Sequence, residues 1–265
     1  MIICEPLGGL NNRTKCLLSA MRVDEDIKLV WAYKDSDVHL WCKFSDIFDM
    51  PFEEFRTMGE CTKKYGSLIP YSHVRFFAKD GEMDINHLDK KYSDNWTEQI
   101  PDDLKKSYLE VAAKLKPVKY IQDKIDEYKQ MFDSNTITVA VRSWMDADKN
   151  VYCMGRYFEI ERLFNILDDN DNKLFVTCDH QGTFDQILDR YKDRVIYVPK
   201  RTEFGDYKTI EGIQDSVIDL YLGGLNKLIL SSMGSSFCEM QWWLGGGNAK
   251  IKVMNLHSNQ DKFCI

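Results

Sequence analysis

Four short polar stretches of this sequence could carry chemistry, because each directly follows an apolar run that predicts a β-strand. They are GGLNNR at residues 8–13, RSW at 142–144, CDH at 178–180 and SSMGSSF at 231–237. In parallel α/β sheets, ligand-binding groups lie beyond the carboxyl ends of the strands. We therefore expect these four stretches to contribute to one ligand site.

Arg142 stands at the end of an apolar strand, a place where a guanidinium is rarely buried without a partner. At a cleft, its fork of N–H groups suits a bidentate grip on a phosphate or a carboxylate. The alternative is a structural ion pair with an acidic neighbour such as Asp146. The residue type alone does not decide between these interpretations.

The serine-rich stretch opens a predicted helix, and the N–H groups of a helix N-terminus can bind an anion. The residues in question are Ser235, Ser236 and Phe237. The alternative is an ordinary N-cap by one of the serines, with Glu239 completing a capping-box-like turn. Considered alone, this segment fits the structural interpretation better.

The turn at residues 8–13 also has two interpretations. Gly8 and Gly9 allow the backbone to approach a ligand, with Asn12 and Arg13 pointing towards it. Alternatively, the glycines only let the following helix pack closely on the strand. Asp179 ends a later strand, where a carboxylate can accept hydrogen bonds from a base or from the hydroxyls of a sugar.

Strands and helices alternate along the chain with short turns, which is typical of a parallel, doubly wound sheet. A strand–helix–strand unit is expected over residues 1–33, and helical periodicity over 102–132 is interrupted at Pro117. We predict an α/β fold with two Rossmann-like domains facing a central cleft. The predicted N-terminal domain is 1–133, and the predicted C-terminal domain is 134–265.

Composition limits the classes of function. A formal charge of −7 argues against a general nucleic-acid or anionic-membrane binder. No run approaches the roughly 20 apolar residues that span a bilayer, and the sequence begins without a basic leader and long apolar core. The eight cysteines include no C-x-x-C pair. We expect reduced thiols, a cytoplasmic location and no transmembrane segment.

Several catalytic motifs are missing from the sequence. It contains no G-x-x-x-x-G-K-[ST] phosphate loop, no G-x-G-x-x-G dinucleotide motif and no G-x-S-x-G nucleophile elbow. Asp146 and Asp148 spell a D-x-D that could hold a metal–diphosphate, but Asp35 and Asp37 match this short pattern equally well. We therefore expect no metal cofactor.

Taken in order, the four stretches resemble motifs of the fucosyltransferase superfamily that includes the α1,6-, nodulation-factor and protein O-fucosyltransferases. GGLNNRTKCLLSA is similar to the glycine-rich opening turn, VAVRSW to the H-x-R-R strand end, FVTCDH to the T-D strand end and LSSMGSSFCEM to the S-S-F-S segment. The resemblance covers about the first thirty residues and the second half. It implies the GT-B arrangement and inverting transfer from a nucleotide-diphosphate sugar, usually GDP-fucose. The resemblance also implies that residues 134–265 bind the nucleotide sugar and that residues 1–133 bind the acceptor.

The resemblance implies a role for each matching residue. Arg142 would hold the β-phosphate and stabilise the leaving diphosphate, and Asp179 would read the guanine edge. Asn12 and Arg13 would close the site from the first domain. The residues that would cradle the diphosphate are Ser235, Ser236 and Phe237, and the glycines that would let the backbone approach are Gly8 and Gly9.

Two positions depart from the family pattern. The motif's His is Ala140 in this sequence and its second Arg is Ser143, which leaves the identity of the donor open. The catalytic base is also unassigned. Glu5, beside the glycine turn, and Asp146, after Arg142, are the two carboxylates placed to reach the cleft.

We predict an inverting, metal-independent glycosyltransferase that moves fucose from GDP-fucose to a hydroxyl of an oligosaccharide or glycoconjugate acceptor. It would need no cofactor beyond the donor substrate, because cations and helix N–H groups can stabilise the leaving diphosphate. One alternative is a transferase of the same fold with another nucleotide sugar, such as a pentose or deoxyhexose donor. The other is a non-catalytic protein that binds a nucleotide or a sugar.

Overall fold

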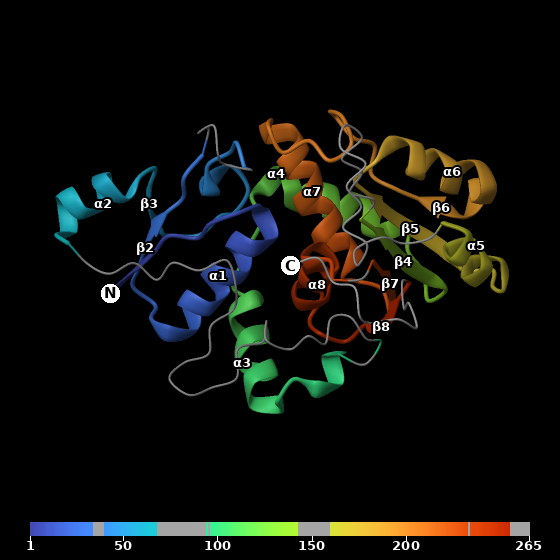
Figure 1. Cartoon of the computed structure of the whole chain (residues 1–265), viewed down its shortest axis with the longest axis horizontal. Helices are drawn as coiled ribbons and strands as arrows, with labels where there is room; N and C mark the ends of the chain where they lie inside the picture. Colours follow the sequence, from blue (N-terminus) through green and yellow to red (C-terminus); the bar gives the residue numbers. More distant parts are fainter. Residues whose placement is uncertain (34–39, 68–93, 95, 143–159, 233, 255–265) are drawn as a thin grey trace, which may run out of the picture.

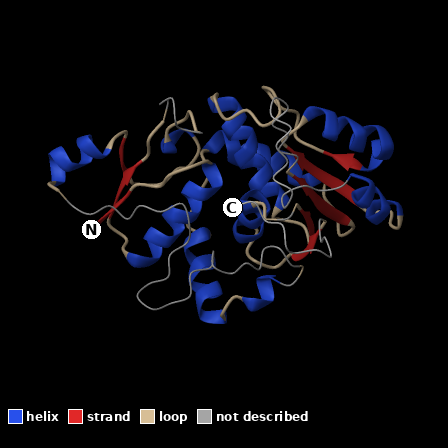
Figure 2. Ribbon diagram, viewed as in Figure 1, coloured by secondary structure: helices blue, strands red, loops and turns tan. Residues whose placement is uncertain are grey.

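Two parallel β-sheets lie at opposite ends of the long axis, with helices between them (Figures 1 and 2). The computed structural model describes residues 1–33, 40–67, 94, 96–142, 160–232 and 234–254. Within these residues, the α/β class and the two parallel sheets expected from the sequence are confirmed.

The N-terminal sheet has three strands in the order β1-β2-β3, and all neighbours are parallel. Its strands are β1 (Ile2–Cys4), β2 (Ile27–Val30) and β3 (Glu53–Phe55). The helices that follow β1 and β3 are α1 (Leu10–Val23) and α2 (Met58–Tyr65). The strand–helix–strand unit expected near the start of the chain is therefore present.

The C-terminal sheet has five parallel strands in the order β6-β5-β4-β7-β8. Its strands are β4 (Thr136–Val141), β5 (Lys173–Cys178), β6 (Val195–Ile196), β7 (Leu228–Ser231) and β8 (Lys250–Val253). Its helices are α5 (Ile160–Asp168), α6 (Gln181–Tyr191), α7 (Ile210–Gly223) and α8 (Ser236–Leu244). Numbered within this sheet, the strand order is 3-2-1-4-5, as in a Rossmann fold.

The central strand β4 is buried along its whole length. Ile137, Val139 and Val141 face one apolar cluster, while Ala140 faces the other. Burial on both faces explains why this strand reads as a nearly continuous apolar run in the sequence.

Helices from the middle of the chain connect the two sheets. They are α3 (Asp102–Ala112) and α4 (Lys119–Tyr128), and Pro117 lies in the break between them, as expected. α3 packs against α1 and α8, and α4 packs against α7. The 3-10 helices among the described residues are Phe44–Asp46, Trp96–Gln99, Lys129–Met131 and Lys192–Arg194.

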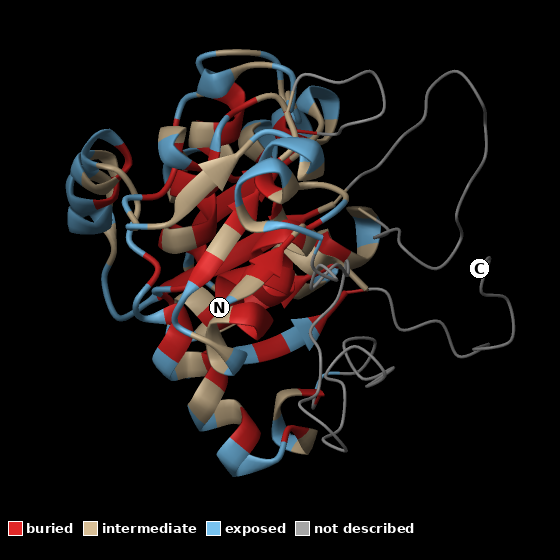
Figure 3. Ribbon diagram, turned by 90° about the vertical axis from the view of Figure 1, so that its left-hand side faces the viewer, coloured by how far each residue is buried: buried red, intermediate tan, exposed pale blue. Residues whose placement is uncertain are grey.

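One apolar cluster extends from the first sheet through the middle helices to the second sheet. Figure 3 shows the buried residues gathered in this interior and the exposed ones around it. Tyr108 of α3 meets Trp243 of α8 with ring centroids 5.6 Å apart, and Trp242 meets Trp243 at 4.7 Å. The second sheet begins at Thr136, but because the core is shared, the expected domain boundary near residue 133 stays a prediction.

Among the described helices, none combines the length and the apolar character that a bilayer span requires. Asp35, Asp37, Asp146 and Asp148 all lie outside the described residues.

The C-terminal ends of α7 and α8 approach each other at two glycines, and this contact yields a first prediction. A Cβ added to Gly245 would lie 2.0 Å from the carbonyl oxygen of Gly224. Gly245→Ala should therefore push the two helices apart and lower the free energy of unfolding by about 1–3 kcal/mol, the usual cost of overpacking. Urea unfolding of the purified chain measures this loss.

Gly59→Ala is the matched control, because a Cβ at that position would have no atom closer than 3.9 Å. Gly59 lies inside α2, where alanine is favoured over glycine by about 0.5–1 kcal/mol. Equal stability changes in the two variants would contradict the close approach of α7 and α8.

Candidate functional site

The candidate site lies where β4 and β7 run side by side, which is the point at which the strand order reverses. Open α/β sheets bind ligands in the crevice outside the carboxyl ends of the strands at such a switch point. The backbone N–H of Arg142 donates to Ser232 Oγ at 2.9 Å, and Ser232 is fully buried. The backbone N–H of Ser232 donates to Ala140 O at 3.1 Å. These bonds hold the ends of the two strands together.

Arg142 and Asp179, which follow the neighbouring strands β4 and β5, form an ion pair. Arg142 Nη1 donates to Asp179 Oδ2 at 2.6 Å. The arginine side chain is 43% exposed and the aspartate side chain 15% exposed. The acidic partner expected from the sequence, Asp146, lies outside the described residues. The guanidinium is thus oriented by a carboxylate and open to solvent at the switch point.

The loop that follows β6 packs against Asp179. Gly205 has φ +74°, and a Cβ there would lie 2.8 Å from Asp179 O, so the loop packs directly on the backbone of Asp179. Arg201 anchors this loop to α7, because its Nε donates to Asp215 Oδ1 at 2.7 Å and Asp215 is buried. The next residue along from Asp179, His180, caps α6, with Nδ1 accepting from Thr183 N at 3.2 Å.

The N-terminus of α8 lies directly after β7. Ser235 is its N-cap, and the serine side chain accepts from the backbone N–H of Cys238 at 3.4 Å. Ser236 is the first helical residue and is half-buried, while Phe237 packs against the central apolar cluster. The capping interpretation is therefore correct for Ser235, whose side chain binds one of the N–H groups in the first turn of α8.

Glu239 does not complete a capping box. Its side chain is buried, and Oε2 accepts from Nζ of Lys15 on α1 at 2.5 Å. Neither this pair nor the bonds of Ser232 to β4 were predicted from the sequence. The available signal for Lys15 was its position directly before the apolar run CLL at residues 16–18, because a charge beside a buried run requires a partner.

The glycine turn of the first sheet closes around Arg13. Gly8 has φ +82°, a conformation that favours glycine. Arg13 Nε donates to Gly8 O and its Nη1 to Ala32 O, both at 2.7 Å. The guanidinium lies 5.2 Å from the ring centre of Trp31, and Arg13 is only 2% exposed.

This burial lowers the pKa of Arg13 to about 10, because the charged form loses its hydration. The side chain shapes the turn and does not reach solvent, so the structure corrects the expectation that Arg13 points towards a ligand.

Three other expected residues of the first sheet lie at the carboxyl end of β1 and the start of α1. Gly9 is the N-cap of α1, and nothing lies within 4 Å of the position of its missing Cβ. Asn12 and Glu5 are half-buried. Partial desolvation raises the pKa of the Glu5 carboxyl. Glu5, Gly9 and Asn12 are therefore partly accessible to solvent, whereas the side chain of Arg13 is buried.

The ion pair between Lys15 and Glu239 connects the two parts of the site. Both residues lie close to the start of their helices, α1 and α8 respectively. The pair therefore brings the glycine turn of the first sheet and the serine segment of the second to the same region of the molecule.

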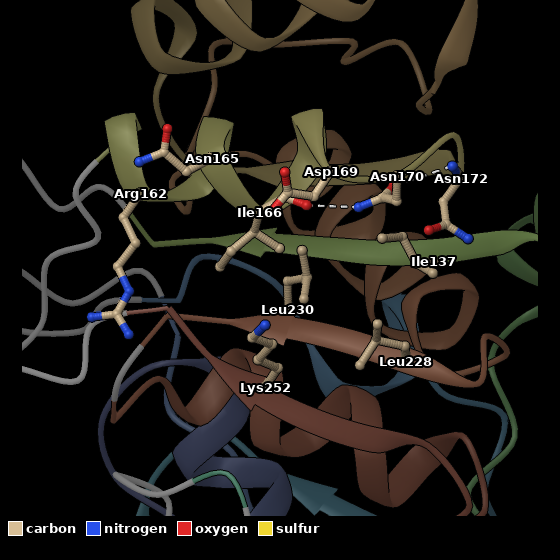
Figure 4. Close-up of a pocket in the computed structure, with 10 residues that line it drawn as sticks. All are labelled: Ile137, Arg162, Asn165, Ile166, Asp169, Asn170, Asn172, Leu228, Leu230 and Lys252. Carbon is tan, nitrogen blue, oxygen red and sulfur yellow. Dashed lines mark hydrogen bonds between the residues drawn. The ribbon is translucent and has the colours of Figure 1, made fainter.

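A cavity of about 330 Å³ lies elsewhere, between α5 and the outer face of the C-terminal sheet (Figure 4). Its floor includes Ile137, Leu228 and Leu230, and Arg162 and Lys252 reach towards it from either side. None of the residues expected to bind a ligand lines this cavity.

No protein-family model matches the sequence, and a search of curated proteins finds no significant match. Solved structures do match. The α1,6-fucosyltransferase NodZ soaked with GDP-fucose has a TM-score of 0.55 and 16% identity, and the match covers 92% of this chain and 91% of NodZ. NodZ from Bradyrhizobium gives 0.52 and 17%, with 91% of each chain covered. POFUT1 in complex with GDP gives 0.52 and 13%, covering 96% of this chain and 98% of that one.

This chain shares the fold of NodZ and POFUT1. The two matches extend over almost the whole of each chain. The fold class expected from the resemblance is confirmed.

The burial of Arg13 yields a prediction that separates a structural role from a binding role. Arg13→Met leaves the carbonyl oxygens of Gly8 and Ala32 without their charged donor, and each such hydrogen bond contributes about 1.5–3 kcal/mol. The free energy of unfolding should fall by about 2–4 kcal/mol in this variant. Chemical unfolding measures the loss, with Arg56→Met, at an exposed arginine, as the control.

At a temperature where Arg13→Met remains folded, its affinity for nucleotide diphosphates should equal that of the unchanged chain. A variant that keeps its stability and loses nucleotide binding would contradict the structural role of Arg13.

Proposed function

We propose that the protein is an inverting, metal-independent glycosyltransferase that transfers fucose from GDP-fucose to a hydroxyl of a glycan acceptor. One observation carries this proposal: Arg142 and the N-terminus of α8 lie together at the switch point of a fucosyltransferase fold. NodZ was solved after soaking with GDP-fucose, and POFUT1 was solved with GDP. These ligands carry the diphosphate that such a site suits.

The proposed chemistry depends on stabilising the leaving group. Cleavage of a glycosyl–phosphate bond builds negative charge on the diphosphate and positive character on the sugar. The Arg142 guanidinium and the N–H groups of the first turn of α8 are fixed before the reaction, so they can stabilise that charge without reorganising. Asp179 orients the guanidinium through Nη1. A carboxylate has lone pairs for further donors, so Asp179 can also accept from a guanine edge.

Inversion requires a base on the face of the sugar opposite the diphosphate. Glu5 suits this role, because it lies at the open edge of the first sheet and its pKa is raised by partial burial. A raised pKa brings a carboxylate closer to the working pH of a general base. Asp146 remains the second candidate, in a segment outside the described residues.

A transferase with another nucleotide sugar is the second candidate function, and Ala140 is the observation that favours it. Ala140 is buried and faces the core, so it offers no side chain to a nucleotide where the family motif has a histidine. The donor must then be recognised by other residues, and its base and sugar can differ from those of GDP-fucose. Loss of the same contact also fits a protein that binds a nucleotide without catalysis.

A nucleotide panel tests the donor. GDP should raise the melting temperature without added metal, and a ligand at a hundredfold excess over its Kd stabilises the fold by about 2.7 kcal/mol. UDP and dTDP should have smaller effects, and EDTA should leave the GDP effect unchanged. Preference for UDP would favour the alternative donor, and binding that requires Mn²⁺ or Mg²⁺ would contradict metal independence.

Substitution of Arg142 tests the catalytic role. Arg142→Ala should retain the fold and lower kcat for fucose transfer by about 10²–10³-fold, the usual cost of removing one charge-stabilising donor from the transition state. Arg142→Lys should recover part of the rate, because it restores the charge without the fork of N–H groups. Product formation from GDP-fucose and a glycan acceptor measures both.

Arg162→Ala is the matched control, because this half-buried arginine lines the cavity on the other face of the sheet. Full activity in Arg142→Ala would overturn the proposed mechanism. GDP binding without transfer or hydrolysis, in the unchanged chain and with a range of acceptors, would instead identify a binding protein.

A further inference from the structure

Within the described part of the chain, the most deeply buried ion pair is formed by Lys15 and Glu239, whose side chains are 1% and 4% exposed. Lys15 belongs to α1 and Glu239 to α8, and their charged atoms lie 2.5 Å apart. Removing two charges from water costs several kcal/mol per ion, and an apolar pair of similar volume often stabilises a fold equally well. A contribution to the stability of the fold therefore does not by itself explain why a buried ion pair is present at this position.

Glu239 lies in the first turn of α8, the helix whose N-terminus we assign to the diphosphate. A carboxylate in the first turn interacts favourably with the helix dipole, and it repels a second anion that approaches the same end. In a buried environment this repulsion is screened much less than at the surface. An unbalanced Glu239 would thus compete directly with the ligand.

We infer that Lys15 is a positioning residue for the anion site, which balances the charge of Glu239 and holds its carboxylate towards α1. This inference rests on the proposed function, because it concerns the same diphosphate site. The ammonium group is supplied by the N-terminal sheet's own helix, whereas the anion is bound by the C-terminal sheet. Ligand affinity in one part of the molecule therefore depends on a charge contributed by the other.

The neighbours of the pair support a fixed position for Lys15. Ser19, one turn further along α1, shares a hydrogen bond of 2.9 Å with Tyr108 of α3. The ring of Tyr108 packs on Trp243 of α8. The three helices thus hold α1 against α8 on the C-terminal side of the ion pair, which leaves Lys15 little freedom to move away from Glu239.

Charge-specific variants separate this role from simple packing. The set is Lys15→Met, Glu239→Gln and the double variant, each measured by calorimetric titration with GDP, with inorganic pyrophosphate and with guanosine. Lys15→Met should weaken GDP and pyrophosphate binding at least tenfold, because Glu239 is left unbalanced beside the anion. Guanosine, which carries no phosphate, should bind with unchanged affinity.

Glu239→Gln should bind both diphosphates as tightly as the unchanged chain or more tightly, since the variant removes a negative charge from the first turn of α8. The double variant should bind them more tightly than Lys15→Met and less tightly than Glu239→Gln. If Lys15→Met fails to fold, the inference is still tested by comparing the diphosphate affinity of the double variant with that of Glu239→Gln. These two variants differ only in the charge at position 15.

Lys105→Met is the matched control. Lys105 lies on α3 and its ammonium is 4.9 Å from the ring centre of Trp242 on α8, so the variant removes a positive charge that contacts the same helix without removing the partner of Glu239. Its diphosphate affinity should equal that of the unchanged chain. An equal loss in Lys15→Met and Lys105→Met would indicate a general charge effect and overturn the inference.

The remaining outcomes are distinct. If all three variants lose affinity in proportion to their loss of stability, the pair is structural and the inference fails. If the unchanged chain binds GDP and Lys15→Met binds it equally well, the inference alone fails. If the unchanged chain binds neither GDP nor pyrophosphate, the proposed function fails and the inference fails with it.

Discussion

The parallel pairing of β4 with β7 is the constraint on which the candidate site depends. Residues of α5, the described helix after β4, and of α8, which follows β7, belong to the apolar clusters on opposite faces of the sheet. In open α/β sheets a binding crevice forms beyond the strand ends at such a point. The bonds of Ser232 to Arg142 N and Ala140 O close the backbone at the base of this crevice. Because that base is fixed, Arg142 and the start of α8 keep a constant relation to each other, which electrostatic stabilisation of a leaving group requires.

Two buried cations lie on α1, the helix that follows the glycine turn. Arg13 is held by backbone carbonyls of the glycine turn, and Lys15 by the carboxylate of Glu239. Neither side chain is placed by hydrophobic burial, because each costs free energy to remove from water. Both side chains position the elements around them. Arg13 fixes the path of the backbone before α1, and Lys15 fixes α1 against α8. The half-buried Asn12 and the open N-cap at Gly9 then lie on a rigid edge.

The fold could be predicted from the sequence because its signals are local. The apolar run of β4 and the break at Pro117 are read directly from the order of the residues. The partners of side chains are not local. Arg142 pairs with Asp179, thirty-seven positions away, and Lys15 pairs with Glu239, 224 positions away. Residue type indicated that these charges need partners, but only the packing of β4 beside β5 and of α1 on α8 decides which ones. The inward turn of Arg13 escaped prediction for the same reason.

Ala140 connects the geometry of the strand ends to the choice of donor. Its carbonyl oxygen accepts from Ser232 Oγ at 3.3 Å and lies 3.5 Å from Cys238 Sγ in the first turn of α8. The small side chain at position 140 faces the cluster that contains Cys238, so α8 can lie close to the sheet. A histidine there would need space that α8 now occupies. The alanine at position 140 is thus coupled to the seating of α8 against the sheet. In the proposed transferase, recognition of the donor base would therefore fall to residues beyond β4, such as Asp179 at the end of β5.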